Sequence, residues 1–86
     1  MAKYVIEYRK TVKKDIKKIA KKDLQQIVEK IYKLSIDPRQ SGIKKLSGTR
    51  DLYRARSGDY RIIYEIRDNE LIVLVIKIGH RSGVYK

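Results

Sequence analysis

The chain has 86 residues, too few to build two hydrophobic cores, so we expect a single domain spanning residues 1–86. It contains no cysteine and one histidine, which excludes disulfides, thiolate nucleophiles and cysteine zinc sites, argues against a metal site and suits a reducing cytosol. Lysine and arginine outnumber aspartate and glutamate by 22 to 10, a net charge of +12, which favours an anionic partner, most commonly nucleic acid, over a merely soluble lysine-rich surface.

The first elements are a strand and a helix. Residues 4–9 place alternate side chains on two faces, a period of two that predicts a β-strand. From Val12 the period becomes helical, with lysines on the opposite face, which predicts an amphipathic helix with Thr11 as its N-cap. The apolar stripe of this helix consists of Val12, Ile16, Ile19 and Ala20.

A second helical pattern begins near Asp23. Asp23 and Gln26 resemble a capping box, and the apolar stripe restarts after them in a new phase that runs to Leu34. Two helices in a hairpin fit this pattern, and one kinked helix is the alternative. Asp37-Pro38 should end the second helix, because the residue before proline is pushed out of the α region.

The second half of the chain predicts a loop followed by three strands. Residues 39–50 contain two glycines and predict an ordered loop. The last strand is apolar on both faces and should therefore be central in the sheet. The expected strands are residues 52–56, 60–66 and 71–78, and the expected tight turns are residues 57–59 and 68–69.

These elements define the fold class. The order β-α-α-β-β-β predicts an α+β domain, with a helical hairpin packed on one face of a mainly antiparallel four-stranded sheet. The strands are predicted from the alternation of side chains and from the turn residues. The same two features predict which residues stand opposite one another in the β-hairpin around residues 57–59.

Three arginines should share one face of that sheet. If Gly58-Asp59 is the centre of the turn, Arg56 stands opposite Arg61 and Arg54 lies on the same face. Like charges opposite one another destabilise a hairpin, so a functional role is one interpretation. The other is that extended arginine stems simply cover apolar sheet. Further cations favour a phosphate-binding surface: Lys44, Lys45 and Arg81.

Four motifs stand out in the second half of the chain: residues 45–48 (Lys-Leu-Ser-Gly), 52–56 (Leu-Tyr-Arg-Ala-Arg), 58–64 (Gly-Asp-Tyr-Arg-Ile-Ile-Tyr) and 78–85 (Ile-Gly-His-Arg-Ser-Gly-Val-Tyr). Together they resemble the RelE family of bacterial and archaeal toxins. The resemblance covers about half of the chain by motif and nearly all of it by order of elements. It implies a RelE-like microbial RNase fold and a toxin of a type II toxin–antitoxin system.

The resemblance also implies an activity. Members of the family inhibit translation by cutting mRNA in the ribosomal A site: the ribose 2′-hydroxyl attacks the scissile phosphate, without a metal or other cofactor. By resemblance, Arg61 would stabilise the transition state and Arg81 would serve the leaving oxygen or the phosphate. Tyr85 would stack on or orient a base beside the scissile bond.

One departure from the family's pattern bears on the general base. Arg54 and Arg56 stand where well-studied members carry lysines, and arginine does not lose its proton as a crowded lysine can. His80 is then the candidate base, because its ordinary pKa of about 6.5 lies near working pH. The alternative is that His80 is a solvent-facing loop residue.

The resemblance implies a cognate antitoxin as protein partner, and mRNA and the ribosome, with its 16S rRNA, as nucleic-acid partners. No apolar run approaches the ~20 residues of a membrane span, and no secretory signal is present. We therefore expect a cytoplasmic protein with no membrane partner.

Two other functions remain open at this stage. A ParE-like inhibitor of DNA gyrase would share the fold without cutting nucleic acid. A non-enzymatic RNA-binding module would use the same positive charge for affinity alone.

Overall fold

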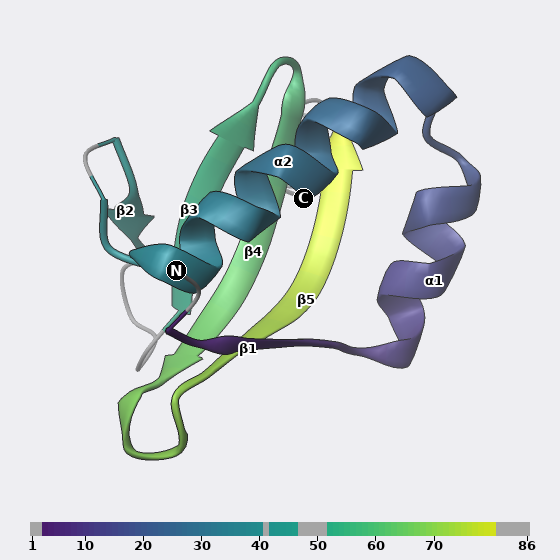
Figure 1. Cartoon of the computed structure of the whole chain (residues 1–86). Helices are drawn as coiled ribbons and strands as arrows, with labels where there is room; N and C mark the ends of the chain where they lie inside the picture. The colour runs from purple at the N-terminus through teal and green to yellow at the C-terminus, as the bar shows by residue number, and fades with distance from the viewer. Residues whose placement is uncertain (1–2, 41, 47–51, 81–86) are drawn as a thin grey trace.

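The computed structural model describes residues 3–40, 42–46 and 52–80. It is an α+β domain, as the sequence predicts, with a sheet whose strand order is β1-β5-β4-β3-β2 (Figure 1). Among the strand pairs of these described residues, only β1–β5 is parallel. The elements in chain order are β1 (Val5–Tyr8), α1 (Lys10–Lys17), α2 (Lys21–Ile36), β2 (Lys44–Lys45), β3 (Leu52–Ser57), β4 (Tyr60–Arg67), the 3₁₀ turn η1 (Asp68–Glu70) and β5 (Ile72–His80).

The prediction of four strands was wrong by one, because β2 lies in the segment expected to be loop. Lys44 pairs with Arg54 and Lys45 with Tyr53, in an antiparallel pairing along the edge of β3. A strand of two residues has no periodicity that a sequence could display. It exists because β3 offers it an open edge.

The core lies between the sheet and the helices. In Figure 1, α2 crosses one face of the sheet, and α1 lies beside β5. Tyr64 on β4 is fully buried, and its hydroxyl donates a hydrogen bond of 2.6 Å to the carbonyl of Pro38. The other fully or almost fully buried residues of this cluster are Val12, Ile19, Ile27, Ile31, Leu34, Ala55, Ile62, Ile66, Val73, Val75 and Ile78.

Both predicted N-caps were wrong, although the helical hairpin and its end at Asp37 are confirmed. The N-cap residues are Arg9 and Ala20, and neither makes a side-chain cap hydrogen bond. Each helix begins earlier than its first apolar residue suggests. The Val12 amide donates to the Arg9 carbonyl (3.0 Å), and the Leu24 amide to the Ala20 carbonyl (2.9 Å), so Thr11 and Asp23 lie inside the first turns.

The hydroxyl of Thr11 serves the sheet instead. β1 pairs with β5 as far as Val75, and α1 then takes over the same strand edge. Thr11 Oγ1 donates to the Ile76 carbonyl (3.3 Å), and Asp15 Oδ2 accepts from the Ile78 amide (3.1 Å). Because positions i and i+4 share one helix face, α1 covers the end of β5 that leads into His80.

The β3–β4 hairpin has the predicted register. Gly58 has φ 59°, a conformation that glycine adopts without strain. Arg56 pairs with Arg61 and Arg54 with Ile63. The other turn was predicted as a tight turn at residues 68–69 and is instead η1, which ends at Leu71 in a left-handed conformation (φ 53°).

A β-bulge interrupts the β4–β5 pairing. Ile63 pairs with Lys77 while its neighbour Tyr64 pairs with Val75, so Ile76 is the extra residue. One extra residue moves every later side chain of the strand to the opposite face. β5 is central, as predicted.

No helix in the part of the chain that the structure describes is long and apolar enough to span a membrane.

Candidate functional site

Three arginines share the sheet face opposite the helices. Ala55 and Ile62 are buried in the core on the helix side, and the alternation of β3 and β4 therefore turns Arg54, Arg56 and Arg61 to the other side. Arg56 is exposed, whereas Arg54 and Arg61 are partly buried. The Nε atom of Arg61 is itself buried. We call these three residues the arginine face.

The character of this sheet face changes along β4. At the far end of the strand, Arg67 Nε lies 2.6 Å from Glu65 Oε2, and its Nη1 lies 3.9 Å from Glu70. The pKa of Arg67 is raised above its ordinary value, mainly by the hydrogen bond to Glu65. Carboxylates of the chain thus compensate the charge of Arg67 at this end of β4.

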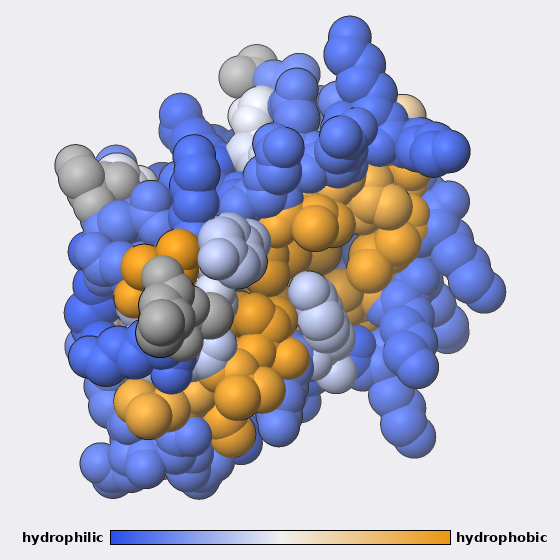
Figure 2. Space-filling view, viewed as in Figure 1, coloured by the Kyte–Doolittle hydropathy of each residue, from blue (hydrophilic) through white to orange (hydrophobic). Residues whose placement is uncertain are grey.

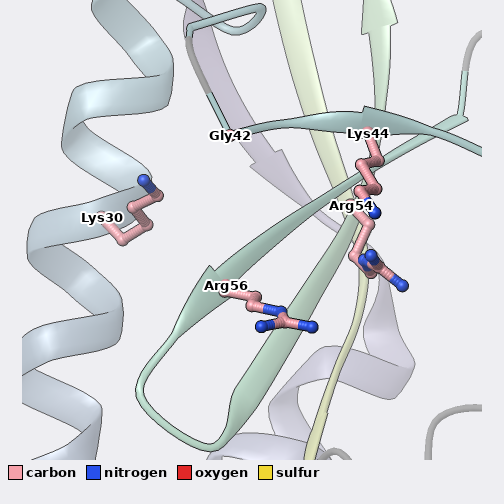
Figure 3. A pocket seen from close by; sticks show the side chains of 5 residues that line it. All are labelled: Lys30, Gly42, Lys44, Arg54 and Arg56. Carbon is pink, nitrogen blue, oxygen red and sulfur yellow. The ribbon is translucent and has the colours of Figure 1, made fainter.

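A pocket of about 400 Å³ lies beside β3, next to the arginine face. Figure 3 shows the side chains around it: two from β3, one from β2 and one from α2. No aspartate or glutamate is among the described residues that line it. The lining residues are Lys30, Gly42, Lys44, Arg54 and Arg56.

Sequence reasoning predicted three of these cations, Lys44, Arg54 and Arg56, as phosphate-binding residues. Lys45 does not line the pocket; it is exposed and pairs with Tyr53. Gly42 has φ 91° in the loop that leads into β2, a conformation that favours glycine.

Sequence reasoning missed Lys30. It lies three residues after Ile27 and four before Leu34, both fully buried, so it shares the helix side that packs on the sheet. Its side chain is partly buried. A lysine in phase with the apolar stripe of a helix was the signal that could have revealed it.

The structure does not bring His80 together with the arginine face. His80 pairs with Tyr60, whose ring packs against the core, and the two rings meet edge to face with centroids 5.5 Å apart. Arg61 pairs with Gly79 and so faces the other way. His80 instead borders a second pocket of about 280 Å³, which is also lined by Asp15 of α1 and by Lys18 and Ile19 just after that helix.

The remaining two predicted catalytic residues, Arg81 and Tyr85, lie outside the described residues. The last described residue, His80, ends β5. The site that can be described therefore consists of the arginine face and the cationic pocket beside it. Guanidinium and ammonium groups in this arrangement can bind phosphate and stabilise charge that develops on it.

The chain is similar to a known family of proteins. A family model described as the ParE toxin of the parDE type II toxin–antitoxin system matches residues 6–85. The putative toxin RelE1 of Methanocaldococcus jannaschii is 33% identical over 87 residues, covering 98% of this chain and 97% of that protein. The mRNA interferase toxin RelE of Escherichia coli K12 is 30% identical over 86 residues, covering 95% and 90%.

Solved structures agree with these relatives. The archaeal RelE–RelB complex of Pyrococcus horikoshii OT3 contains a chain with a TM-score of 0.82 and 30% identity, covering 95% of this chain and 99% of that chain. The isolated Escherichia coli RelE toxin has a TM-score of 0.79 and 29% identity, covering 95% and 90%. The chain therefore belongs to the RelE family of toxins of type II toxin–antitoxin systems.

Proposed function

We propose that this toxin is a metal-independent endoribonuclease that cuts mRNA in the ribosomal A site and so inhibits translation. The arginine face is the observation that carries the proposal, because it gathers three permanent cations beside a pocket that can receive a phosphate. The relative from Escherichia coli at 30% identity is named an mRNA interferase, which supports the reaction class.

Arg61 is the residue that we assign to the transition state. Attack by the 2′-hydroxyl creates a phosphorane with more negative charge than the ground-state phosphate, and a fixed guanidinium stabilises that extra charge. Partial burial of Arg61 strengthens the interaction, because less water screens it. Arg54 and Arg56 bind backbone phosphates of the RNA in this scheme, and Arg81 and Tyr85 keep the roles that the resemblance implies.

We do not assign the general base to His80. The bulge at Ile76 turns His80 to the helix side, with the sheet between its ring and Arg61. A base must come within hydrogen-bond reach of the 2′-hydroxyl, and the observed placement of His80 does not provide this.

The same proposal includes a cognate antitoxin. Relatives from Pyrococcus horikoshii and Escherichia coli have been solved as complexes of RelE with RelB. The helix-covered side of this chain has a band of apolar side chains bordered by hydrophilic ones (Figure 2), and Val28, Tyr32 and Ile36 are exposed along α2. A partner with apolar and acidic side chains would cover this band and neutralise the net charge of +12.

Primer extension on a reporter mRNA in a translating extract tests the cleavage. The wild-type protein should cut the message at discrete positions within codons, and these cuts should require translation. Arg61→Ala should lower the rate of cleavage by about 100-fold or more. Arg67→Ala is the matched control, because it removes an arginine from the same face of β4 that is already held by Glu65. Its cuts should match those of the wild type.

Two outcomes would count against cleavage as proposed. If the message stays intact with the wild-type protein, a ParE-like inhibition of DNA gyrase becomes the better function. The matching family model, which is that of a ParE toxin, favours this as the second candidate, and a supercoiling assay would detect it. If Arg61→Ala cuts as well as the wild type, Arg61 has no role in the transition state.

A further inference from the structure

The cationic pocket beside β3 has one wall that does not belong to the sheet. Lys30 extends from the side of α2 that faces β3, while Lys44, Arg54 and Arg56 enter from the strands (Figure 3). Four cations around one space of about 400 Å³ repel one another. An arrangement of this kind costs stability in the free protein and is relieved when an anion binds.

The strand edge in this pocket is also open. β2 pairs only with Tyr53 and Arg54, so the residues of β3 that follow Arg54, Ala55–Ser57, have no partner strand on their outer side within the part of the chain that is described. Backbone amides at such an edge can donate hydrogen bonds to phosphate oxygens. The pocket therefore combines charge with potential neutral donors.

Arg56 connects this pocket with the arginine face. It lines the pocket and is also the direct cross-strand partner of Arg61, and neighbouring strands lie about 5 Å apart. An RNA strand bound in the pocket would thus pass directly to Arg61. The pocket volume lies within the range of about 300–1,000 Å³ that is typical of small-molecule sites, so a phosphate with its ribose can enter it.

We propose that this pocket binds the sugar-phosphate of an mRNA nucleotide next to the cleaved one, and that Lys30 is an RNA-binding residue of the toxin. The inference rests on the proposed function, since it names a second binding position on the same substrate. Lys30 holds a phosphate that does not react, so it binds the ground state and the transition state equally. Its loss should weaken RNA binding and raise KM while kcat stays unchanged.

Binding of a short RNA in which every ribose is 2′-O-methylated provides the test, because this probe cannot be cleaved. Fluorescence anisotropy should show Kd about three- to tenfold higher for Lys30→Gln than for the wild type. The plot of log binding constant against log salt concentration should become shallower, with the magnitude of its negative slope reduced by about 1. Lys30→Arg keeps the cation and should restore both values.

Lys21→Gln is the matched control. Lys21 is exposed, lies on the same helix about two and a half turns earlier and therefore points the opposite way, and the change in net charge is identical. An equal loss of affinity in Lys21→Gln and Lys30→Gln would overturn the proposal, because binding would then follow net charge alone. Wild-type affinity in Lys30→Gln would overturn it as well.

The result does not depend on catalysis. If primer extension shows no cleavage but Lys30→Gln weakens RNA binding more than Lys21→Gln does, the pocket is an RNA-binding site and the proposed reaction is wrong. If cleavage is observed and Lys30→Gln binds the probe like the wild type, the proposed reaction is supported and RNA binding in the pocket is excluded. Equal thermal midpoints for the two glutamine variants would establish that both are folded.

Discussion

Arg56 and Arg61 are direct cross-strand partners in the β3–β4 hairpin, so two guanidinium groups occupy neighbouring positions on one face of the sheet. Like charges in this relation destabilise a hairpin, whereas opposite or neutral pairs stabilise it. The pair therefore lowers the stability of the free toxin. It also creates the positive potential that a phosphate backbone requires.

Replacing Arg56 with threonine should separate these two effects. We expect Arg56→Thr to raise the free energy of unfolding by about 0.2–1 kcal/mol, since threonine suits a strand and removes the repulsion. The same variant should bind RNA less tightly. Urea unfolding and anisotropy measure the two quantities. Arg67→Thr should instead lower stability, because Arg67 is paired with Glu65; a loss of stability in Arg56→Thr would contradict the argument.

Asp15 on α1 should hold the end of β5 in place. Its side chain is 11% exposed, and its two oxygens accept from Lys77 Nζ and from the Ile78 amide, both at 3.1 Å. Asp15→Ala should lower the free energy of unfolding by about 1–3 kcal/mol, because the Ile78 amide loses its acceptor. Amide hydrogen exchange at Ile78 should become faster.

Lys77→Gln is the control for the Asp15 prediction. Lys77 is about half exposed, so the loss of its ion pair should cost less than about 1 kcal/mol, and the Ile78 hydrogen bond remains. Equal effects of Asp15→Ala and Lys77→Gln would show that the ion pair, rather than the backbone hydrogen bond, is what matters.

The sequence predicted the parts of the site that depend on local alternation. The pairing of Arg56 with Arg61 follows from the turn at Gly58-Asp59 and a period of two, both visible in the sequence. Lys30 could not be placed in the same way, because its position in the pocket depends on how α2 packs on the sheet.

The position of His80 shows why alternation alone was insufficient. On one side of the bulge, Arg67 pairs with Ile72 and Tyr64 with Val75. If this register continued to the end of β5, Arg61 would pair with Ile78. His80, two residues further on, would then lie on the same face as Arg61. The extra residue at Ile76 shifts the register by one and turns His80 to the helix side. Nothing in an apolar run marks where such a bulge lies, so the side of the sheet on which His80 lies could not be predicted from the sequence.

The contact between Asp68 and Arg39 should make stability depend on pH at acid values. Two hydrogen bonds from Arg39 (3.0 and 2.8 Å) and one from the Tyr4 hydroxyl (2.8 Å) lower the pKa of Asp68 to about 2. The unfolded pKa is about 3.9. Ionised Asp68 therefore stabilises the fold fully above about pH 4, and this contribution disappears as the pH falls through about 2.

Thermal unfolding of the wild type and Asp68→Asn across this pH range provides the measurement. The wild type should melt higher near neutral pH, and the difference should vanish near pH 2. Both side chains are about half exposed, so high salt should also reduce the difference. A difference that persists unchanged at about pH 2 would exclude this pair as its source.

Tyr64 and Tyr53 allow a comparison of two tyrosine hydroxyl groups on stacked rings, whose centroids are 6.0 Å apart. The Tyr64 hydroxyl is buried, which raises its pKa, and it donates to the buried carbonyl of Pro38. The Tyr53 hydroxyl accepts a long bond of 3.4 Å from Arg39 Nε at the surface. Tyr64→Phe should thus cost about 1–3 kcal/mol in urea unfolding, and Tyr53→Phe less than about 1 kcal/mol. Because Tyr64 points to the helix side, its variant should still bind RNA like the wild type; weakened binding would mean that the core and the arginine face are coupled through β4.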